Sequence, residues 1–156
     1  MNDMSRLLTD LSNLSVRLNQ ESDALTDLVA RFETVLCDLK LGVEVSLQKP
    51  ISSEVWVDEK NHVEGVTKTH LGFCKGDQGW GLYVWKSEHD EATPDTERHL
   101  RDASRDDRIA AVEHFPALLK AMKEQAEEVI GELQRVNKST NFPATFAEIA
   151  REALKR

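Results

Sequence analysis

Few residues of this chain are spaced in a way that could support chemistry. His70 and Cys74 lie four apart in a predicted strand, so they share one face and could supply two metal ligands. No Cys-x-x-Cys or His-Glu-x-x-His pattern supplies further ligands, and no nucleophile is spaced to meet a base. We therefore predict no metal site, no cofactor and no catalytic residue.

One set of charged residues allows an enzymatic alternative. Glu44 lies on the first predicted strand, and the run Asp58-Glu59-Lys60 ends the second. This order, after a helix and before more strands, resembles the PD-(D/E)xK nuclease family, although no Pro-Asp dipeptide precedes Glu44. The resemblance implies that Glu44 and Asp58 would hold Mg²⁺ and that Lys60 would position or activate the attacking water. A small Mg-dependent hydrolase is the alternative function.

Four arginines follow one another at spacings of three, four and three: Arg98, Arg101, Arg105 and Arg108. On a helix this spacing places them along one face, where they could clamp a phosphate or the carboxylates of a partner. Nearby acids favour instead a neutralised, solvated face: Glu97, Asp102, Asp106 and Asp107. A third interpretation is that the arginines meet acids of the N-terminal helix and fix its register: Glu21, Asp27 or Glu33.

The predicted sheet contains most of the large aromatic side chains. By alternation Trp80 faces one way with Leu82 and Val84, while Tyr83 and Trp85 face the other. We expect Trp80 to lie in the core. Tyr83 and Trp85 belong either to a second packed face or to an exposed surface that binds a partner.

The N-terminal forty residues must form the longest element. From Met4 to Leu39 apolar residues recur in steps of three and four, and Glu21 is the one polar residue in this seam. Leu8, Val29 and Leu36 widen the stripe, so more than one element should pack on it. We expect one continuous helix ending at Gly42, with a break near Asn19 to Ser22 as the alternative. The candidate interaction residues on this helix are Leu25, Leu28 and Phe32.

The middle of the chain changes to the alternating pattern of strands. Four are predicted, with turn residues between them, at Val43 to Leu47, Glu54 to Asp58, Val63 to Cys74 and Trp80 to Lys86. Because the connections are short, an antiparallel meander is the simplest topology.

Helical patterning returns after a polar connector. Thr93-Pro94-Asp95 predicts one helix start, and Ser104 is a second candidate. A seam from Val112 to Val136 follows, which Pro116 should kink or restart, before a short final helix from Ala144 to Lys155. We predict a single α+β domain (helix 1–41, sheet 42–88, helical region 94–156) whose helices pair in a coiled-coil-like layer.

Composition limits the classes of partner. The 156 residues carry a net charge of −8, so binding to bulk nucleic acid or to an anionic membrane is not expected. No signal peptide and no membrane-spanning run is visible, and Cys37 and Cys74 should be reduced thiols in a cytoplasmic protein.

The length of the first helix points to function. At 1.5 Å per residue it would span about 54 Å, about 17 Å more than the seam from Val112 to Val136 can cover. The final helix could cover the remainder, or a second copy of the chain could. We therefore predict a non-enzymatic interaction or assembly protein, of adaptor or inhibitor type, that binds a protein partner or itself as a homodimer.

Overall fold

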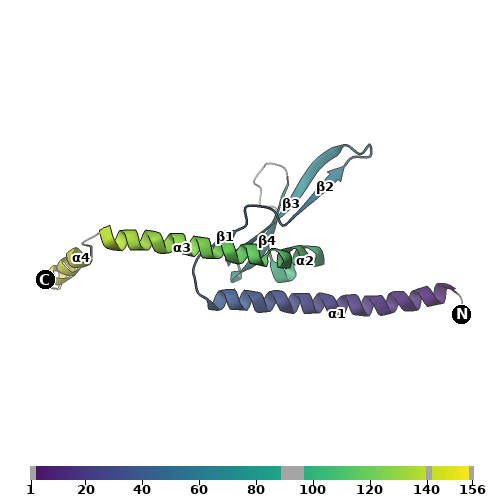
Figure 1. The fold of residues 1–156 in the computed structure, drawn as a ribbon, viewed down its shortest axis with the longest axis horizontal. Helices are drawn as coiled ribbons and strands as arrows, with labels where there is room; N and C mark the ends of the chain where they lie inside the picture. The colour runs from purple at the N-terminus through teal and green to yellow at the C-terminus, as the bar shows by residue number, and fades with distance from the viewer. Residues whose placement is uncertain (1–2, 89–96, 140–141, 155–156) are drawn as a thin grey trace.

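The computed structural model describes residues 3–88, 97–139 and 142–154 and confirms an α+β fold (Figure 1). The helices are α1 (Asp3–Asp38), α2 (Arg105–Glu113), α3 (Phe115–Ser139) and α4 (Phe142–Ala153), with a short 3-10 helix η1 at Leu100–Asp102. The strands are β1 (Val45–Ser46), β2 (Ser52–Val57), β3 (Val63–Gly76), β4 (Gly79–Glu88) and β5 (Arg98–His99).

The long N-terminal helix is continuous, as predicted, with no break near Asn19 to Ser22. α1 ends at Asp38, one residue before Leu39, the last leucine of the seam. The chain then turns at two residues with a left-handed backbone conformation, Lys40 at φ 50° and Gly42 at φ 65°. Glycine adopts this conformation without the steric cost that a Cβ brings. The turn lets the chain leave α1 and enter the sheet.

The sheet is antiparallel, but it is not the simple four-stranded meander predicted. β1 and β2 both pair with β3, and backbone bonds bridge them, from Leu47 N–H to Leu71 O (2.9 Å) and from Ile51 N–H to Thr69 O (2.8 Å). They therefore form one ribbon, which is interrupted around Pro50 because proline has no N–H to donate. β4 pairs with the other edge of β3, and β5 adds an unpredicted fifth strand beside β4.

The segment that carries the four arginines is not one helix. Arg98 lies in β5, Arg101 in η1, and Arg105 and Arg108 in α2, so the predicted single stripe is wrong. The cause is the second candidate start: the Ser104 side chain accepts a hydrogen bond from Asp107 N–H at 3.1 Å and caps α2. Thr93, Pro94 and Asp95 lie outside the described residues.

Of the two outcomes predicted near Pro116, a kink or a restart, the structure shows the restart, because two separate helices meet there. α2 ends at Glu113, His114 caps it, and α3 begins at Phe115. Pro116 lies in the first turn of α3, where the missing N–H has no partner to lose.

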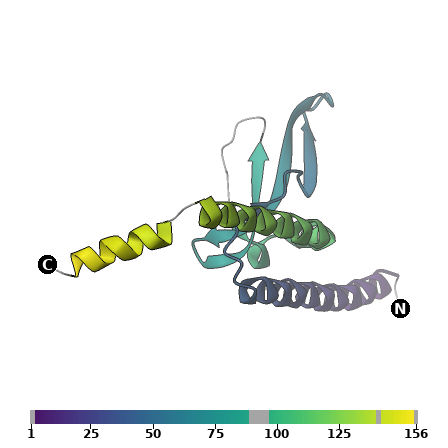
Figure 2. The same cartoon turned by 60° about the vertical axis from the view of Figure 1, so that its left-hand side comes forward.

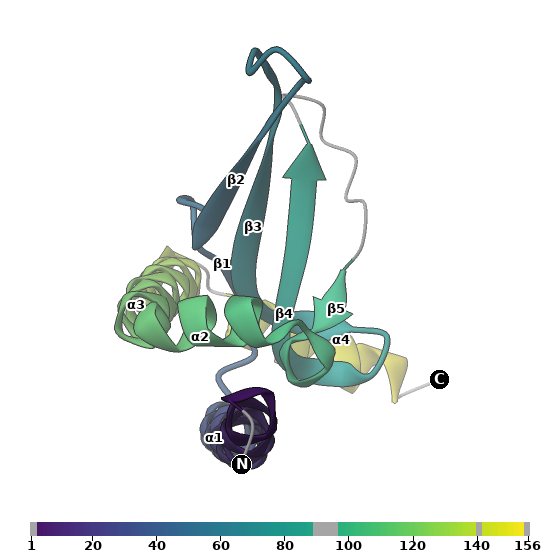
Figure 3. The same cartoon turned by 90° about the vertical axis from the view of Figure 1, so that its right-hand side faces the viewer.

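The core lies where the helices meet one end of the sheet. Leu71, Phe73 and Leu82 of the sheet pack against the inner side chains of the helices, among them Val29, Leu36, Leu100, Phe115, Leu118 and Met122. Figure 3 shows α1, α2 and the start of α3 at this end, whereas β2 and the adjoining part of β3 stand away from them. All six residues of β2 are exposed.

Candidate functional site

The N-terminal half of α1 projects from the molecule beyond α2 (Figure 1). Every side chain from Asp3 to Glu21 is exposed. The leucines of this segment, which we call the free arm (residues 3–21), are 50–61% exposed: Leu7, Leu8, Leu11, Leu14 and Leu18. The free arm therefore presents a contiguous apolar stripe to solvent.

The remainder of α1 has two apolar faces. Leu28 and Val35 continue the open stripe, at 49% and 57% exposed. Val29 and Leu36 are buried on the body, and Phe32 is half-buried, with its ring stacked on Phe115 at 3.9 Å between centroids. More than one element packs on this helix, as predicted, because α2, η1 and β4 all contact it. Of the three interaction candidates on α1, Leu25 and Phe32 turn toward the body, and Leu28 stays open.

Neither predicted internal partner covers the free arm. α1 and α3 meet at Phe32 and Phe115, but their outer parts project to opposite sides of the molecule (Figure 1). Ile130 and Leu133 of α3 are 52% and 57% exposed, so the second seam is also open at its outer end. α4 lies beyond that end, far from the free arm (Figures 1 and 2), so the final helix does not supply the missing cover.

A buried polar cluster fastens the other half of α1 to the sheet; we call it the Glu33 clamp (Glu33, His99 and the Leu82 N–H). Glu33 is 8% exposed and accepts hydrogen bonds from Leu82 N–H at 2.8 Å and His99 Nε2 at 2.9 Å. His99 Nδ1 accepts from Arg101 Nε at 3.3 Å, so the ring presents its Nε2–H to the carboxylate. A Cβ at Gly81 would lie 2.8 Å from His99 Nε2, so only glycine leaves room for the clamp.

A second polar contact holds α1 immediately after the free arm. The Arg108 guanidinium donates to Thr26 Oγ1 and, at 3.2 Å, to Ser22 Oγ. Arg101 Nε lies 3.7 Å from Glu33 Oε1. These contacts agree with the interpretation in which the arginines fix the register of α1, with Arg108 meeting two hydroxyls in place of a carboxylate. Arg105 is exposed.

Tyr83 and Trp85, the two aromatic candidates for a partner surface, are buried and half-buried. Tyr83 is 4% exposed, and its hydroxyl donates to Gly79 O at 3.0 Å. Burial raises the pKa of Tyr83. Trp85 is half-buried, with its ring stacked on His70 at 5.7 Å between centroids. Trp80 was expected in the core, but it is 36% exposed and stacks on Phe73.

The residues of the nuclease-like pattern are not brought together. Glu44 accepts a hydrogen bond from Lys75 N–H (3.2 Å), near one end of β3. Asp58 lies in the turn before Val63 at the other end, where it accepts from the Lys60 and His62 N–H groups at 2.8 Å. Twelve residues of strand separate the two ends, about 40 Å. One Mg²⁺ cannot bridge Glu44 and Asp58 in this fold.

The other chemical candidates are also held in structural contacts. His70 Nε2 lies 3.1 Å from Ser87 Oγ, and Cys74 Sγ lies 3.8 Å from Glu97 Oε1. Burial and the neighbouring carboxylates raise the pKa of Cys74 to about 11, and burial raises the pKa of Cys37. Thiols with raised pKa values are poor nucleophiles at neutral pH. Within the described ranges no group of three or more His, Cys, Asp or Glu residues could hold a metal ion.

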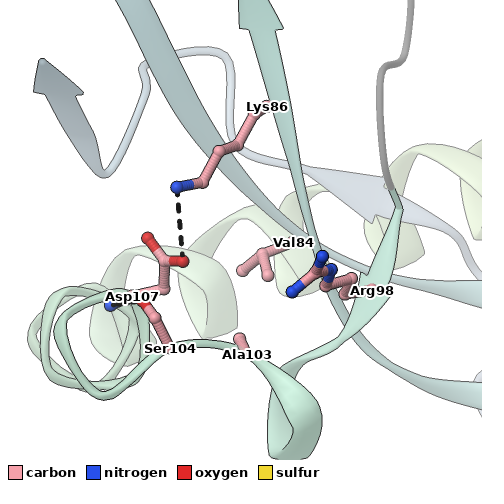
Figure 4. Close-up of a pocket in the computed structure, with 6 residues that line it drawn as sticks. All are labelled: Val84, Lys86, Arg98, Ala103, Ser104 and Asp107. Carbon is pink, nitrogen blue, oxygen red and sulfur yellow. Dashed lines mark hydrogen bonds and ion pairs between the residues drawn. The ribbon is translucent and has the colours of Figure 1, made fainter.

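A small polar cavity lies between β4, β5 and the start of α2 (Figure 4). Its volume is about 170 Å³, and it is lined by Val84, Lys86, Arg98, Ala103, Ser104 and Asp107. Lys86 Nζ pairs with Asp107 Oδ2 at 3.7 Å, and Ser104 is occupied as the cap of α2. Binding sites for small molecules are typically about 300–1,000 Å³. The cavity is therefore below that range, and two of its polar groups bind each other.

Comparisons with known proteins assign this chain to no family. The chain matches no protein-family model, no curated protein and no solved structure. No helix in the part of the chain that the structure describes has the length and hydropathy needed to cross a bilayer.

Proposed function

We propose that this protein is a non-enzymatic interaction and assembly protein whose binding surface is the apolar seam of the free arm. The observation that carries the proposal is the uniform exposure of residues 3–21, with five leucines half exposed or more. Neither α3 nor α4 covers them. The cost of leaving this stripe in water is recovered when a partner helix lies along it.

The manner in which α1 is held supports the same function. The Glu33 clamp and the Arg108 contact both lie after residue 21, so the body grips only one half of the helix. The other half is displayed as a helix of about 28 Å at 1.5 Å per residue. A partner helix could reach its seam without displacing any contact of the body.

The experiment compares two double variants with equal changes of charge. Leu11→Asp/Leu14→Asp places two carboxylates in the seam, and Ser12→Asp/Asn13→Asp places two on the opposite side of the same helix. The chromatographic size of each tagged protein is measured in an extract of its source cells. We expect the wild type and the Ser12/Asn13 variant to elute as an assembly and the leucine variant to elute as a monomer, because only the latter disrupts the seam.

Two outcomes would contradict the proposal. The first is a wild-type protein that elutes as a monomer in the extract. The second is an assembly that survives Leu11→Asp/Leu14→Asp. Tryptophan fluorescence of the purified variants should match the wild type, since neither position contacts the body.

A further inference from the structure

We infer that the partner of the free arm is the free arm of a second copy, bound antiparallel and centred between Leu11 and Leu14. This inference rests on the proposed function and gives it a specific partner. It makes the assembly a symmetric homodimer, in which each contact occurs twice.

The seam of the free arm is self-complementary in this alignment. Leu11 of one copy faces Leu14 of the second copy, and Leu7 faces Leu18 of the second copy, so each central layer contains two leucines. Met4 and Glu21 form the outermost layer at each end. The alignment therefore uses the segment from 4 to 21, which is the part of the seam that lies within the exposed 3–21 range.

Glu21 also fits this alignment better than it fits a continuous intramolecular seam. It lies at the edge of the interface, beside the first turn of α1 in the second copy. A carboxylate is stabilised near a helix N-terminus by the helix dipole. The one polar residue of the seam thus marks the end of the contact.

The flanking charges select the same alignment. Asp10 and Arg17 each directly precede a seam leucine, so they border the seam on the same side. In the antiparallel pair Asp10 lies about 3 Å along the axis from Arg17 of the second copy, given a rise of 1.5 Å per residue. Side chains tilt toward the N-terminus of their own helix, which brings these two toward each other. The pair occurs twice.

Alternative alignments bring like charges together. A shift of one heptad in one direction places Asp10 opposite Asp10 of the second copy. A shift in the other direction places Arg17 opposite Arg17 and moves Glu21 inward against Leu11. A parallel pair in register would place Glu21 against Glu21 in the seam, where an unpaired charge is costly.

The antiparallel arrangement also keeps the two bodies apart. Glu21 of one copy and Glu21 of the second copy lie about 25 Å from each other along the axis, at 1.5 Å per residue. Each body then lies beyond the N-terminal end of the other copy's helix. The second copy therefore lies alongside the free arm, which projects from the body in Figure 1.

The test exchanges the two flanking charges and measures the dimer Kd by sedimentation equilibrium of the full-length protein. Asp10→Arg alone sets arginine against Arg17 at both sites, and Arg17→Asp alone sets aspartate against Asp10 at both sites. We expect each single variant to raise the Kd about tenfold or more. An equimolar mixture of the two should form a heterodimer with opposite charges at both sites and a Kd near that of the wild type.

Arg6→Asp is the matched control for Arg17→Asp, because Arg6 lies on the side of the helix away from the seam. It should change the Kd less than about threefold, as expected for an exposed charge outside the interface. A homodimer whose Kd responds to Arg6→Asp as it does to Arg17→Asp would overturn the alignment. So would a mixture that fails to associate more tightly than its components.

A purified wild-type protein that stays monomeric at every concentration would overturn the homodimer itself. In that case the extract experiment still decides the proposed function, because an assembly lost on Leu11→Asp/Leu14→Asp would then contain a different partner. The two inferences can therefore fail separately.

Discussion

Replacing Glu33 with alanine should strongly destabilise the protein, because Glu33 is the shared acceptor of the Glu33 clamp. Its carboxylate accepts from Leu82 N–H at 2.8 Å and from His99 Nε2 at 2.9 Å. His99 is 6% exposed, so its ring has little access to bulk water in place of the lost acceptor. The substitution therefore leaves two buried donors without a partner.

The expected loss follows from those two donors. Each buried donor left unsatisfied costs about 1–3 kcal/mol, so Glu33→Ala should lower the free energy of unfolding by about 2–6 kcal/mol. Loss of the ion pair between Glu33 and Arg101 adds little to this free energy, since the Arg101 side chain is 47% exposed and its Nε lies 3.7 Å from Glu33 Oε1. For a domain of this size 1 kcal/mol shifts Tm by about 2–4 °C, so a mid-range loss gives about 12 °C.

Urea unfolding followed by tryptophan fluorescence measures this loss. The Leu11→Asp/Leu14→Asp background is the suitable one, because association would otherwise make stability depend on protein concentration. Glu132→Ala, at an exposed position of α3, is the control and should change stability by less than about 0.5 kcal/mol. A Glu33→Ala loss no larger than that of the control would refute the role given to the clamp.

Three further predictions address the body of the protein. Gly81→Ala should destabilise the fold, because its Cβ would lie 2.8 Å from His99 Nε2. Gly131→Ala has open space around its Cβ and should stabilise α3 by about 0.5–1 kcal/mol. A lower Tm for Gly131→Ala than for Gly81→Ala in thermal unfolding would contradict this prediction. The pKa of Cys74 is raised to about 11, so this thiol should react with iodoacetamide at neutral pH about 100-fold more slowly than a thiol of pKa 9. The rate is measured in a Cys37→Ser variant, in which Cys74 is the one remaining thiol. A rate equal to that of free cysteine would be inconsistent with its burial. Burial lowers the pKa of His70 below its ordinary value of 6.5, so the folded state binds the proton less tightly than the unfolded state, and stability should fall as pH drops through 6.5. In His70→Asn the stability lost between about pH 7.5 and about pH 5.5 should be smaller; equal losses in both proteins would contradict this prediction.

The sequence predicted α1 well because its signal is repeated many times. The three-four spacing from Met4 to Leu39 identifies a continuous helix even though its serines and asparagines favour turns. The residues that widen the stripe also predict that more than one element packs on the helix, which the contacts of α2, η1 and β4 confirm. Spacing alone does not indicate that the body holds the helix from Ser22 onward, because that depends on polar partners far away in the chain.

The sheet was harder to predict because its pairing is nonlocal. Nothing in the alternation around Lys49 and Pro50 distinguishes two neighbouring strands from one interrupted strand that keeps the same partner, β3. β5 was missed because Arg98 and His99 form only two residues of strand, and their arginine spacing fits a helix equally well. Ser104 was the useful local signal, since its cap separates Arg101 from the helix that holds Arg105.

The Glu33 clamp could be predicted only in part. One acid on α1 meeting a later arginine was foreseen, and Glu33 with Arg101 is that pair. The main partners, His99 and the Leu82 N–H, carry no periodic signal, because a buried hydrogen bond between elements depends on tertiary placement. Gly81 was the one local indication, as a small residue between the large side chains of Trp80 and Leu82.

The division of α1 into a held half and a free half has a consequence for how this protein can change over generations. Residues 3–21 are exposed, so substitutions that preserve the helix leave the packing of the body unchanged, and under the proposed function they act on the choice of partner. Substitutions from Ser22 to Asp38 act on folding first. A lineage could therefore acquire a new partner by changing a few arm residues, without the loss of stability that usually opposes new binding surfaces.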